Sequence, residues 1–124
     1  EMTVLITGDM SFSYDVNGLS STYLSPRFKI IVMCNGGGGI FRFIKPTSDL
    51  PELETCFEIH RDISVEKYAD LFGLRYFELN DEKSAAEVLS LFFAEKDRPA
   101  ILAVHTPNVY NAEVLRGYFR RSRQ

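Results

Sequence analysis

The residues best suited to bind a ligand stand at the ends of two apolar runs. Asp9 comes just after residues 3–7, and Asn35, with four glycines behind it, comes just after residues 28–33. Both runs are short and rich in β-branched residues, which is typical of buried parallel strands. Carboxylate and amide oxygens suit a hard cation such as Mg²⁺, and the N–H groups of a glycine-rich backbone suit a phosphate. Because open α/β sheets bind ligands beyond the carboxyl ends of their strands, the pattern predicts a magnesium–diphosphate site there.

The glycine run, residues 36–39, matches neither of two common nucleotide-binding motifs. A dinucleotide fingerprint would need glycine at position 41, which is Phe41, and a P-loop would need Gly-Lys-Ser/Thr after the run. A plain flexible turn remains open, but four consecutive glycines lose much chain entropy on folding. Close approach of the backbone to a ligand explains the run better.

The elements that must position these residues alternate along the chain. Apolar strands are expected at residues 3–7, 28–33, 75–79 and 100–104, and helices at about 12–20, 64–72, 80–95 and 109–121. Ser11 is expected to cap the first helix and Asn80 or Asp81 the third. The core side of that third helix is expected to carry Ala85, Val88, Leu89, Phe92 and Phe93. The alternation predicts an α/β fold, three-layer αβα with a mainly parallel sheet, in which residues 1–124 form one domain.

Composition excludes several classes of function. The chain has 124 residues, 45% of them hydrophobic and 25% charged, as in an ordinary globular domain. A net charge of −3 argues against nucleic-acid binding, and no apolar run approaches the ~18 residues of a membrane helix. Two cysteines make a poor disulfide framework, so we expect reduced thiols and a cytoplasmic location.

Three sequence blocks together resemble one enzyme family. These are Gly8-Asp9-Met10-Ser11-Phe12, then Asp15-Val16-Asn17-Gly18-Leu19, then Asn35-Gly36-Gly37-Gly38-Gly39-Ile40-Phe41. They resemble the C-terminal domain of SEPHCHC synthases (2-succinyl-5-enolpyruvyl-6-hydroxy-3-cyclohexene-1-carboxylate synthases), thiamine-diphosphate enzymes of menaquinone biosynthesis. Thiamine-diphosphate enzymes carry Gly-Asp followed, some two dozen residues later, by Asn-Asn, and Asp9 and Asn35 have this spacing. The resemblance continues through residues 57–60, 68–74 and 99–111, so it covers nearly the whole chain.

The resemblance implies a thiamine-diphosphate-binding fold and assigns its ligands. The metal, Mg²⁺ or Mn²⁺, would be held by the Asp9 carboxylate, the Asn35 side-chain oxygen and the Gly37 main-chain carbonyl. Phe41 and Ile44 would line the substrate region, although simple core packing is an equal alternative for Ile44. No residue of this chain is assigned a catalytic role. The whole cofactor-binding set implied is Gly8, Asp9, Met10, Ser11, Asn35, Gly37, Gly38, Gly39 and Ile40.

The same resemblance implies the reaction and the partners. The enzyme would be a transferase, a carboligase that decarboxylates 2-oxoglutarate and adds the succinyl carbanion to isochorismate. This chain would be a C-terminal fragment that anchors diphosphate and metal and is inactive alone, because the family activates the cofactor from a separate pyrimidine-binding domain. The full-length enzyme is expected to be a homodimer or homotetramer.

One departure and two alternatives accompany the resemblance. Cys34 stands where the first Asn of the pair is expected, which affects the hydrogen bonds of that amide but not the metal ligand at Asn35. The chain could instead belong to another thiamine-diphosphate carboligase or a 2-oxoacid decarboxylase. It could also be a non-enzymatic domain that binds an anion or a nucleotide.

Other charged residues have simpler explanations. Arg42 and Lys45 could meet acidic substrates, but solvated surface is the expected role of each. His60 is expected to pack in a loop or against a partner domain, and His105, at the end of a strand, to be structural or exposed.

Overall fold

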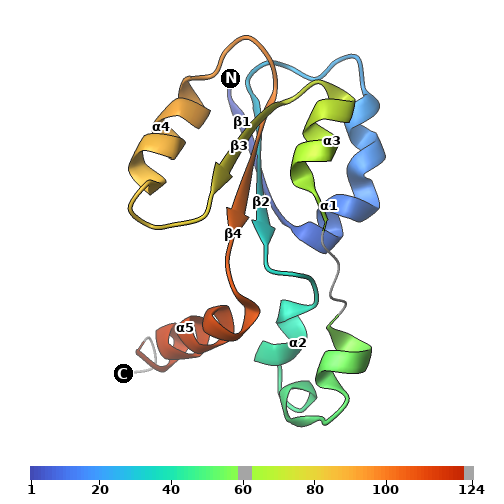
Figure 1. Ribbon diagram of the computed structural model, residues 1–124, viewed down its shortest axis with the longest axis vertical. Coiled ribbons are helices and arrows are strands. Elements are labelled where there is room, and N and C mark those ends of the chain that lie inside the picture. The colour runs from blue at the N-terminus through green and yellow to red at the C-terminus, as the bar shows by residue number, and fades with distance from the viewer. Residues whose placement is uncertain (59–62, 122–124) are drawn as a thin grey trace. The chain divides into compact units, whose positions relative to one another are not determined.

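A computed structural model describes residues 1–58 and 63–121, and two compact units are recognised in it (Figure 1). Unit 1 comprises Glu1–Cys34 and Ile63–His105. Unit 2 comprises Asn35–Asp62 and Thr106–Gln124. His60 lies outside the described residues, so its predicted role stays a prediction. The single predicted domain likewise stays a prediction.

Unit 1 contains the predicted parallel sheet. Its strands are β1 (Thr3–Gly8), β2 (Phe28–Cys34), β3 (Arg75–Leu79) and β4 (Ala100–His105). All three pairings are parallel, and the order across the sheet is β1-β2-β4-β3. β1 and β2 are therefore neighbours, with Gly8 opposite Met33. These are the two strands that the sequence predicted to precede the ligands of the site.

Helices cover both faces of this sheet. α1 (Asp9–Asp15), the 3₁₀ turn η1 (Val16–Ser20) and α3 (Val65–Phe72) pack on one face, and α4 (Ala85–Ala94) packs on the other (Figure 1). Right-handed crossovers require this division, since the chain moves in one direction from β1 to β3 and then back to β4. The α/β three-layer prediction is confirmed.

Strand alternation explains why each face has its own core. Ile30, Val32, Ile101 and Ala103 point to the α1 and α3 side, while Ala100 and Leu102 pack with Phe92 of α4 on the other side. Side chains of successive strand residues point to opposite faces, so a run without polar residues buries both. The predicted core helix is confirmed at Phe92, but the neighbouring Phe93 is exposed and contacts the Phe92 ring edge-on.

Of the three predicted helix starts in unit 1, two were wrong and one was correct. α3 begins as predicted, with the Ser64 hydroxyl accepting the N–H of Lys67, and ends at Gly73 in the left-handed conformation. α4 begins at Ala85 rather than near residue 81, because Asp81 accepts the N–H groups of Lys83 and Ser84 in a preceding turn. The first helix begins at Asp9 and not beyond Ser11.

Lys29 is a buried cation near the amino end of the central strand β2. Gly8 and Cys34 lie at the other end of the sheet, where the strands end. Its ammonium donates to the carbonyl of Glu95, at 2.6 Å, and lies over the Phe92 ring. Burial lowers the pKa of Lys29, and the nearby Glu95 charge acts in the opposite direction. This lysine holds the end of α4 against the sheet and is a structural residue.

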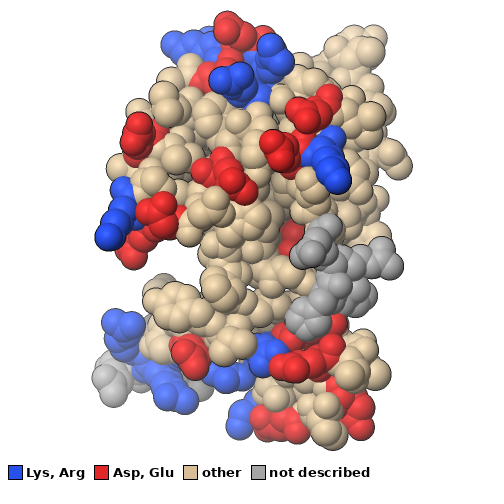
Figure 2. Space-filling view, viewed as in Figure 1, with Lys and Arg blue, Asp and Glu red and all other residues tan. Residues whose placement is uncertain are grey.

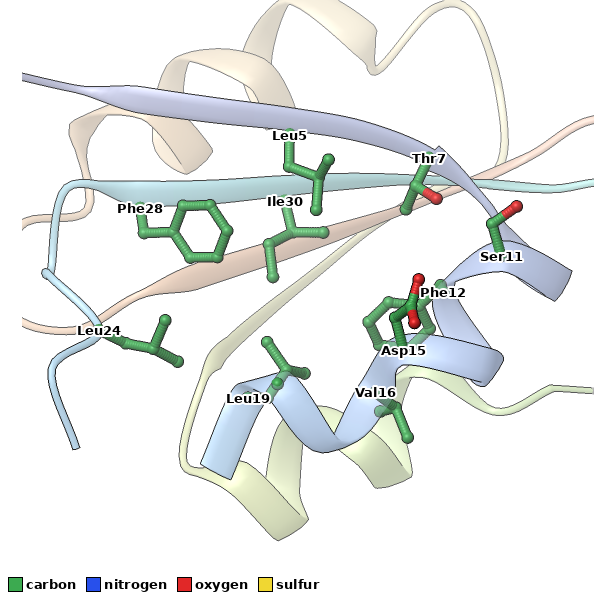
Figure 3. Close-up of a pocket in the computed structure, with 11 residues that line it drawn as sticks. Leu5, Thr7, Ser11, Phe12, Asp15, Val16, Leu19, Leu24, Phe28 and Ile30 are labelled. Atoms are coloured by element: carbon green, nitrogen blue, oxygen red, sulfur yellow. The ribbon is translucent and has the colours of Figure 1, made fainter. Parts of the chain in front are cut away.

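The outer strand β1 is exposed on both sides of the sheet. Val4, Leu5 and Ile6 are all exposed, Ile6 by 67%. Beside β1 an apolar pocket of about 300 Å³ opens between the sheet and the α1–η1 segment (Figure 3). Leu5, Phe28 and Ile30 form its sheet side, and Leu19 and Leu24 face them. Parallel sheets are normally covered, so this edge is unusual.

Unit 2 is built of short helices and one long one. These are α2 (Gly39–Phe43), the 3₁₀ turn η2 (Thr47–Asp49), the π-helical turn η3 (Leu53–Phe57) and α5 (Asn108–Arg121). The sequence predicts a short helical turn at residues 40–44, after the glycines, and α2 confirms it. The sequence also predicts a loop from Lys45 to Pro51, and this segment contains the η2 turn.

Charge is mixed over the surface of unit 1. Figure 2 shows acidic and basic side chains scattered over this unit on the face in view, without a continuous basic patch. None of the described helices is long and apolar enough to cross a membrane.

Candidate functional site

Asp9 lies directly beyond the carboxyl end of β1. Gly8, in extended conformation, is the N-cap of α1, so the chain passes from strand to helix with no loop between them. The Asp9 side chain is 5% exposed, and its Oδ1 accepts the N–H of Met10 at 2.8 Å. Carboxylate oxygens are common ligands of hard cations such as Mg²⁺. A cation is a suitable partner for an oxygen in this position.

Ser11 does not have the capping role that the sequence predicted. It lies inside α1, whose N-cap Gly8 offers no side-chain oxygen. It is one of the residues that line the apolar pocket beside β1 (Figure 3). The physical reason is that the helix already begins at Asp9, whose carboxylate accepts one of the orphan N–H groups, that of Met10.

Cys34 ends β2, where the family carries its first Asn. It is half-buried, and its Sγ lies 3.6 Å from the Val32 carbonyl. Burial, and after it the nearby Asp9 charge, raise the pKa of the Cys34 thiol to about 11. Such a thiol is protonated at neutral pH and is a poor nucleophile. This agrees with the prediction that Cys34 is not catalytic.

We expect Cys34 to resist alkylation in the folded chain. With a pKa of about 11, roughly one thiol in a thousand is ionised at pH 8, against about a quarter of an ordinary cysteine. Cys56 is exposed and serves as the internal control. Iodoacetamide at pH 8, followed by peptide mass spectrometry, should label Cys56 at least tenfold faster, and the difference should vanish in urea. Equal rates in the folded chain would contradict this prediction.

Asn35 and the glycines form a tight loop in unit 2. Gly36, Gly37 and Gly38 have φ angles of 83°, 85° and 71°, a left-handed region that other residues rarely adopt. Gly37 is buried and donates its N–H to Asn35 Oδ1 at 3.1 Å. The loop thus requires glycine for its backbone shape, and not only for flexibility. Asn35 Oδ1 has a second lone pair, which a metal could use.

The predicted substrate-region residues differ in exposure. Ile40 and Ile44 are 61% and 44% exposed, whereas Phe41 is half-buried against the Phe57 ring, with 5.4 Å between centroids. Ile40 lies in α2 and Ile44 directly follows it, and exposed isoleucines can meet a ligand or another protein surface. Simple core packing, the alternative for Ile44, is therefore wrong.

The Arg42 side chain is only 20% exposed and is engaged in ion pairs. Its guanidinium donates to both carboxylate oxygens of Glu58, at 2.8 and 2.6 Å, and to Glu54 at 2.9 Å. The Glu58 side chain is fully buried. The planar guanidinium of Arg42 donates all three of these hydrogen bonds. Hydrogen bonds with Glu58, and then with Glu54, raise the pKa of Arg42. The predicted solvated surface role is wrong for Arg42, and holds for Lys45, whose side chain is exposed.

The Arg42–Glu58 pair anchors α2 within unit 2. It ties α2 to the segment after η3, and Arg116 of α5 donates to the Arg42 carbonyl. His105 forms a comparable, more exposed contact in unit 1, where its Nε2 lies 3.0 Å from Glu78. Charged side chains of the strand ends and of α2 are thus engaged in structure.

Two residues near the predicted site were missed by sequence analysis. Asn108, the first residue of α5, donates its side-chain N–H to the Gly37 carbonyl at 3.1 Å. Glu58 is the buried partner of Arg42. No local pattern marks either one, since Asn108 reads only as a helix start after Pro107, and Glu58 as an ordinary acidic residue.

The predicted site residues fall into two groups. Gly8, Asp9, Met10 and Ser11 are brought together in unit 1 at the start of α1. Asn35, Gly37, Gly38, Gly39 and Ile40 are brought together in unit 2 at the start of α2, with Phe41 and Ile44 next to them. A metal site that joins Asp9 to Asn35 and Gly37 therefore stays a prediction.

The chemistry of the predicted donors suits Mg²⁺ rather than a softer metal. No group of three or more His, Cys, Asp or Glu that could hold a metal occurs within residues 1–58 and 63–121. The predicted set has one carboxylate, one amide oxygen and one main-chain carbonyl, all oxygen donors. Mg²⁺ is commonly held by few protein oxygens, with water and phosphate oxygens filling its octahedron. The residues present fit that ion.

Comparison with known proteins gives a consistent result. The chain is 49% identical over 117 residues to 2-succinyl-5-enolpyruvyl-6-hydroxy-3-cyclohexene-1-carboxylate synthase of Porphyromonas gingivalis. These 117 aligned residues are 94% of the chain. It is 40% identical over 117 residues to the enzyme of that name in Flavobacterium johnsoniae, and 32% identical over 124 residues to that of Cytophaga hutchinsonii. No protein-family model matches the chain.

The match covers only part of each relative. The chain spans 20% to 22% of the length of these relatives. Identity of this level over almost every residue of the chain reflects common ancestry, and it confirms the resemblance seen in the sequence. The chain is homologous, along nearly its whole length, to one segment of the SEPHCHC synthases.

Proposed function

We propose that this chain is the diphosphate- and metal-anchoring segment of a cytoplasmic SEPHCHC synthase of menaquinone biosynthesis. The observation that carries the proposal is the 49% identity over 94% of the chain to a protein of that name. It is supported by the adjacency of β1 and β2, which directly precede Asp9 and Asn35 in the chain. The full-length protein would then be an enzyme, a transferase.

We assign the following roles to this chain's residues. Asp9, Asn35 and Gly37 hold Mg²⁺ through three oxygens, and the peptide N–H groups around Met10, Ser11, Gly38 and Gly39 hold diphosphate. The buried Asp9 carboxylate supplies the negative charge that a divalent cation needs. Ile40, Phe41 and Ile44 offer apolar surface to the rest of the ligand and to substrate. Gly8 allows the strand to pass directly into α1, which places Asp9 at its end.

The cofactor we propose is thiamine diphosphate. When bound, it supplies the carbanion chemistry that decarboxylates 2-oxoglutarate and transfers the succinyl unit to isochorismate. This chain's residues bind and orient it, and a pyrimidine-binding domain elsewhere in a homo-oligomeric enzyme completes the site. The isolated chain is then expected to have no turnover and to bind the cofactor weakly at best.

Two experiments test the proposal. The full-length enzyme should form SEPHCHC from 2-oxoglutarate and isochorismate only with thiamine diphosphate and Mg²⁺, while pyruvate with a second 2-oxoacid should give no product. Calorimetry of the full-length enzyme should show heat of binding for thiamine diphosphate with Mg²⁺ and none for ATP or NAD. Turnover of pyruvate instead would favour another carboligase or decarboxylase, and binding of ATP or NAD alone would favour a non-enzymatic domain.

A further inference from the structure

The Gly37 peptide is held from two directions within unit 2. Its N–H donates to Asn35 Oδ1, and its carbonyl accepts an N–H of Asn108, both at 3.1 Å. Asn108 lies at the start of α5, 71 positions further along the chain. A contact between such distant residues is a tertiary constraint on the loop, not a local turn.

The loop needs such a constraint because glycines order poorly. Gly36, Gly37 and Gly38 all have left-handed φ angles, and each could adopt many others. Ordering a residue costs backbone entropy, and glycine loses more than other residues. Hydrogen bonds from side chains on either side of Gly37 offset part of that cost and select one direction for its carbonyl.

The orientation of the Asn108 amide is determined by its surroundings. The amide nitrogen faces the Gly37 carbonyl, so the oxygen faces Gly39. That oxygen is buried and, among the described residues, has no hydrogen-bond partner. A buried acceptor without a partner is destabilising, and such a cost in a folded protein calls for a reason.

Gly39 makes room for this orientation. A Cβ at position 39 would lie 2.5 Å from Asn108 Oδ1 and 2.9 Å from Asn35 Nδ2. Gly39 is not in the left-handed region, so space and not backbone conformation requires glycine here. Any side chain at position 39 would push the Asn108 amide away from Gly37.

We infer that Asn108 is a positioning residue that aims the Gly37 carbonyl at the proposed metal, an inference that rests on the proposed function. A carbonyl oxygen has two lone pairs, so it can accept from Asn108 and still bind a cation. Groups that orient metal ligands in this way typically change metal affinity 10- to 100-fold when they are removed. Asn108 itself touches neither metal nor cofactor.

The test compares two asparagines of α5 in the full-length enzyme. Asn108→Ala should raise the Mg²⁺ concentration for half-maximal activity about 10- to 100-fold. At saturating Mg²⁺, kcat should return to within about twofold of wild type, since only the metal site is loosened. Asn111→Ala is the matched control, because its amide donates to Thr106 and not to the glycine loop. A purely structural role in α5 would move both variants alike, and that result would overturn the inference.

A double variant tests the shared mechanism. Gly39→Ala should also raise the Mg²⁺ requirement, because it displaces the Asn108 amide and crowds Asn35. The Gly39→Ala/Asn108→Ala enzyme should then be no worse than Gly39→Ala alone, since one hydrogen bond is lost only once. Effects that multiply in the double variant would show that the two residues act independently and would refute the mechanism.

A ligand-free measurement separates this inference from the proposed function. Amide exchange of Gly38, whose N–H shares a peptide with the Gly37 carbonyl, should be roughly threefold to tenfold faster in Asn108→Ala than in Asn111→Ala. If wild type shows no Mg²⁺-dependent binding of thiamine diphosphate, the proposed function fails whatever the exchange result. Unchanged exchange at Gly38 refutes the positioning role even if wild type binds both ligands.

Discussion

Replacing Asp9 with Asn in the full-length enzyme is expected to abolish Mg²⁺-dependent binding of thiamine diphosphate. The amide keeps the shape of the side chain and can still accept the Met10 N–H. It lacks the negative charge, which is the only formal charge in the proposed ligand set. Because loss of a partner that merely orients a ligand costs 10- to 100-fold, loss of the charged ligand itself should cost about 100-fold or more. Calorimetric titration of thiamine diphosphate with and without Mg²⁺ measures this directly.

The matched control for Asp9 lies at the other end of the same helix. Asp15 is exposed and ends α1, so Asp15→Asn removes the same charge from the same element. It should leave binding within about twofold of wild type. If Asp9→Asn binds thiamine diphosphate and Mg²⁺ as tightly as Asp15→Asn does, the metal assignment is wrong.

Replacing Glu58 with Gln should destabilise unit 2 by roughly 2–3 kcal/mol. The substitution leaves the Arg42 guanidinium beside a buried, uncharged group, so the cost of desolvating Arg42 is no longer offset. Removing one partner of a fully buried pair costs about 3–5 kcal/mol, and we place this pair lower because Arg42 keeps Glu54 and is partly exposed. Urea unfolding followed by circular dichroism would report the change as a lower midpoint.

Glu54→Gln is the control for that experiment. Glu54 binds the same guanidinium, but its side chain is 69% exposed, and exposed pairs contribute about 0–1 kcal/mol. The two variants differ in burial and not in chemistry, so a larger effect at Glu58 isolates the contribution of burial. Equal midpoints would mean that the Glu58 carboxylate is well hydrated in solution.

Much of the fold follows from sequence pattern because buried strands are locally distinctive. The run at Arg75–Leu79 was predicted with its observed bounds, and the other three strands differ by a residue or less at either end. Helix starts were less predictable, because several residues can satisfy the same N–H groups. Asp81 was expected to cap a helix, but its carboxylate accepts N–H groups in the turn before that helix. Ser11 was expected to cap a helix that already begins at Asp9.

The site could be predicted only where its residues follow strands. Asp9 and Asn35 stand out because parallel neighbours end at one edge, which makes their types meaningful together. Asn108 and Glu58 carry no such mark, since each acquires its role from a partner far along the chain. Arg42 was expected at the solvated surface because a basic residue is usually exposed, and here it pairs with the buried Glu58 instead.

The bare β1 strand has a consequence for biochemical work on the chain by itself. Among the described residues, the outer edge of β1 pairs with no other strand, so its N–H and C=O groups and its apolar side chains form a template onto which another extended polypeptide can add. Particles built through this edge would grow with protein concentration and would differ from the subunit arrangement of the proposed full-length enzyme. A sedimentation profile of the isolated chain therefore reports self-association through the β1 edge. The quaternary structure has to be measured on the proposed full-length protein.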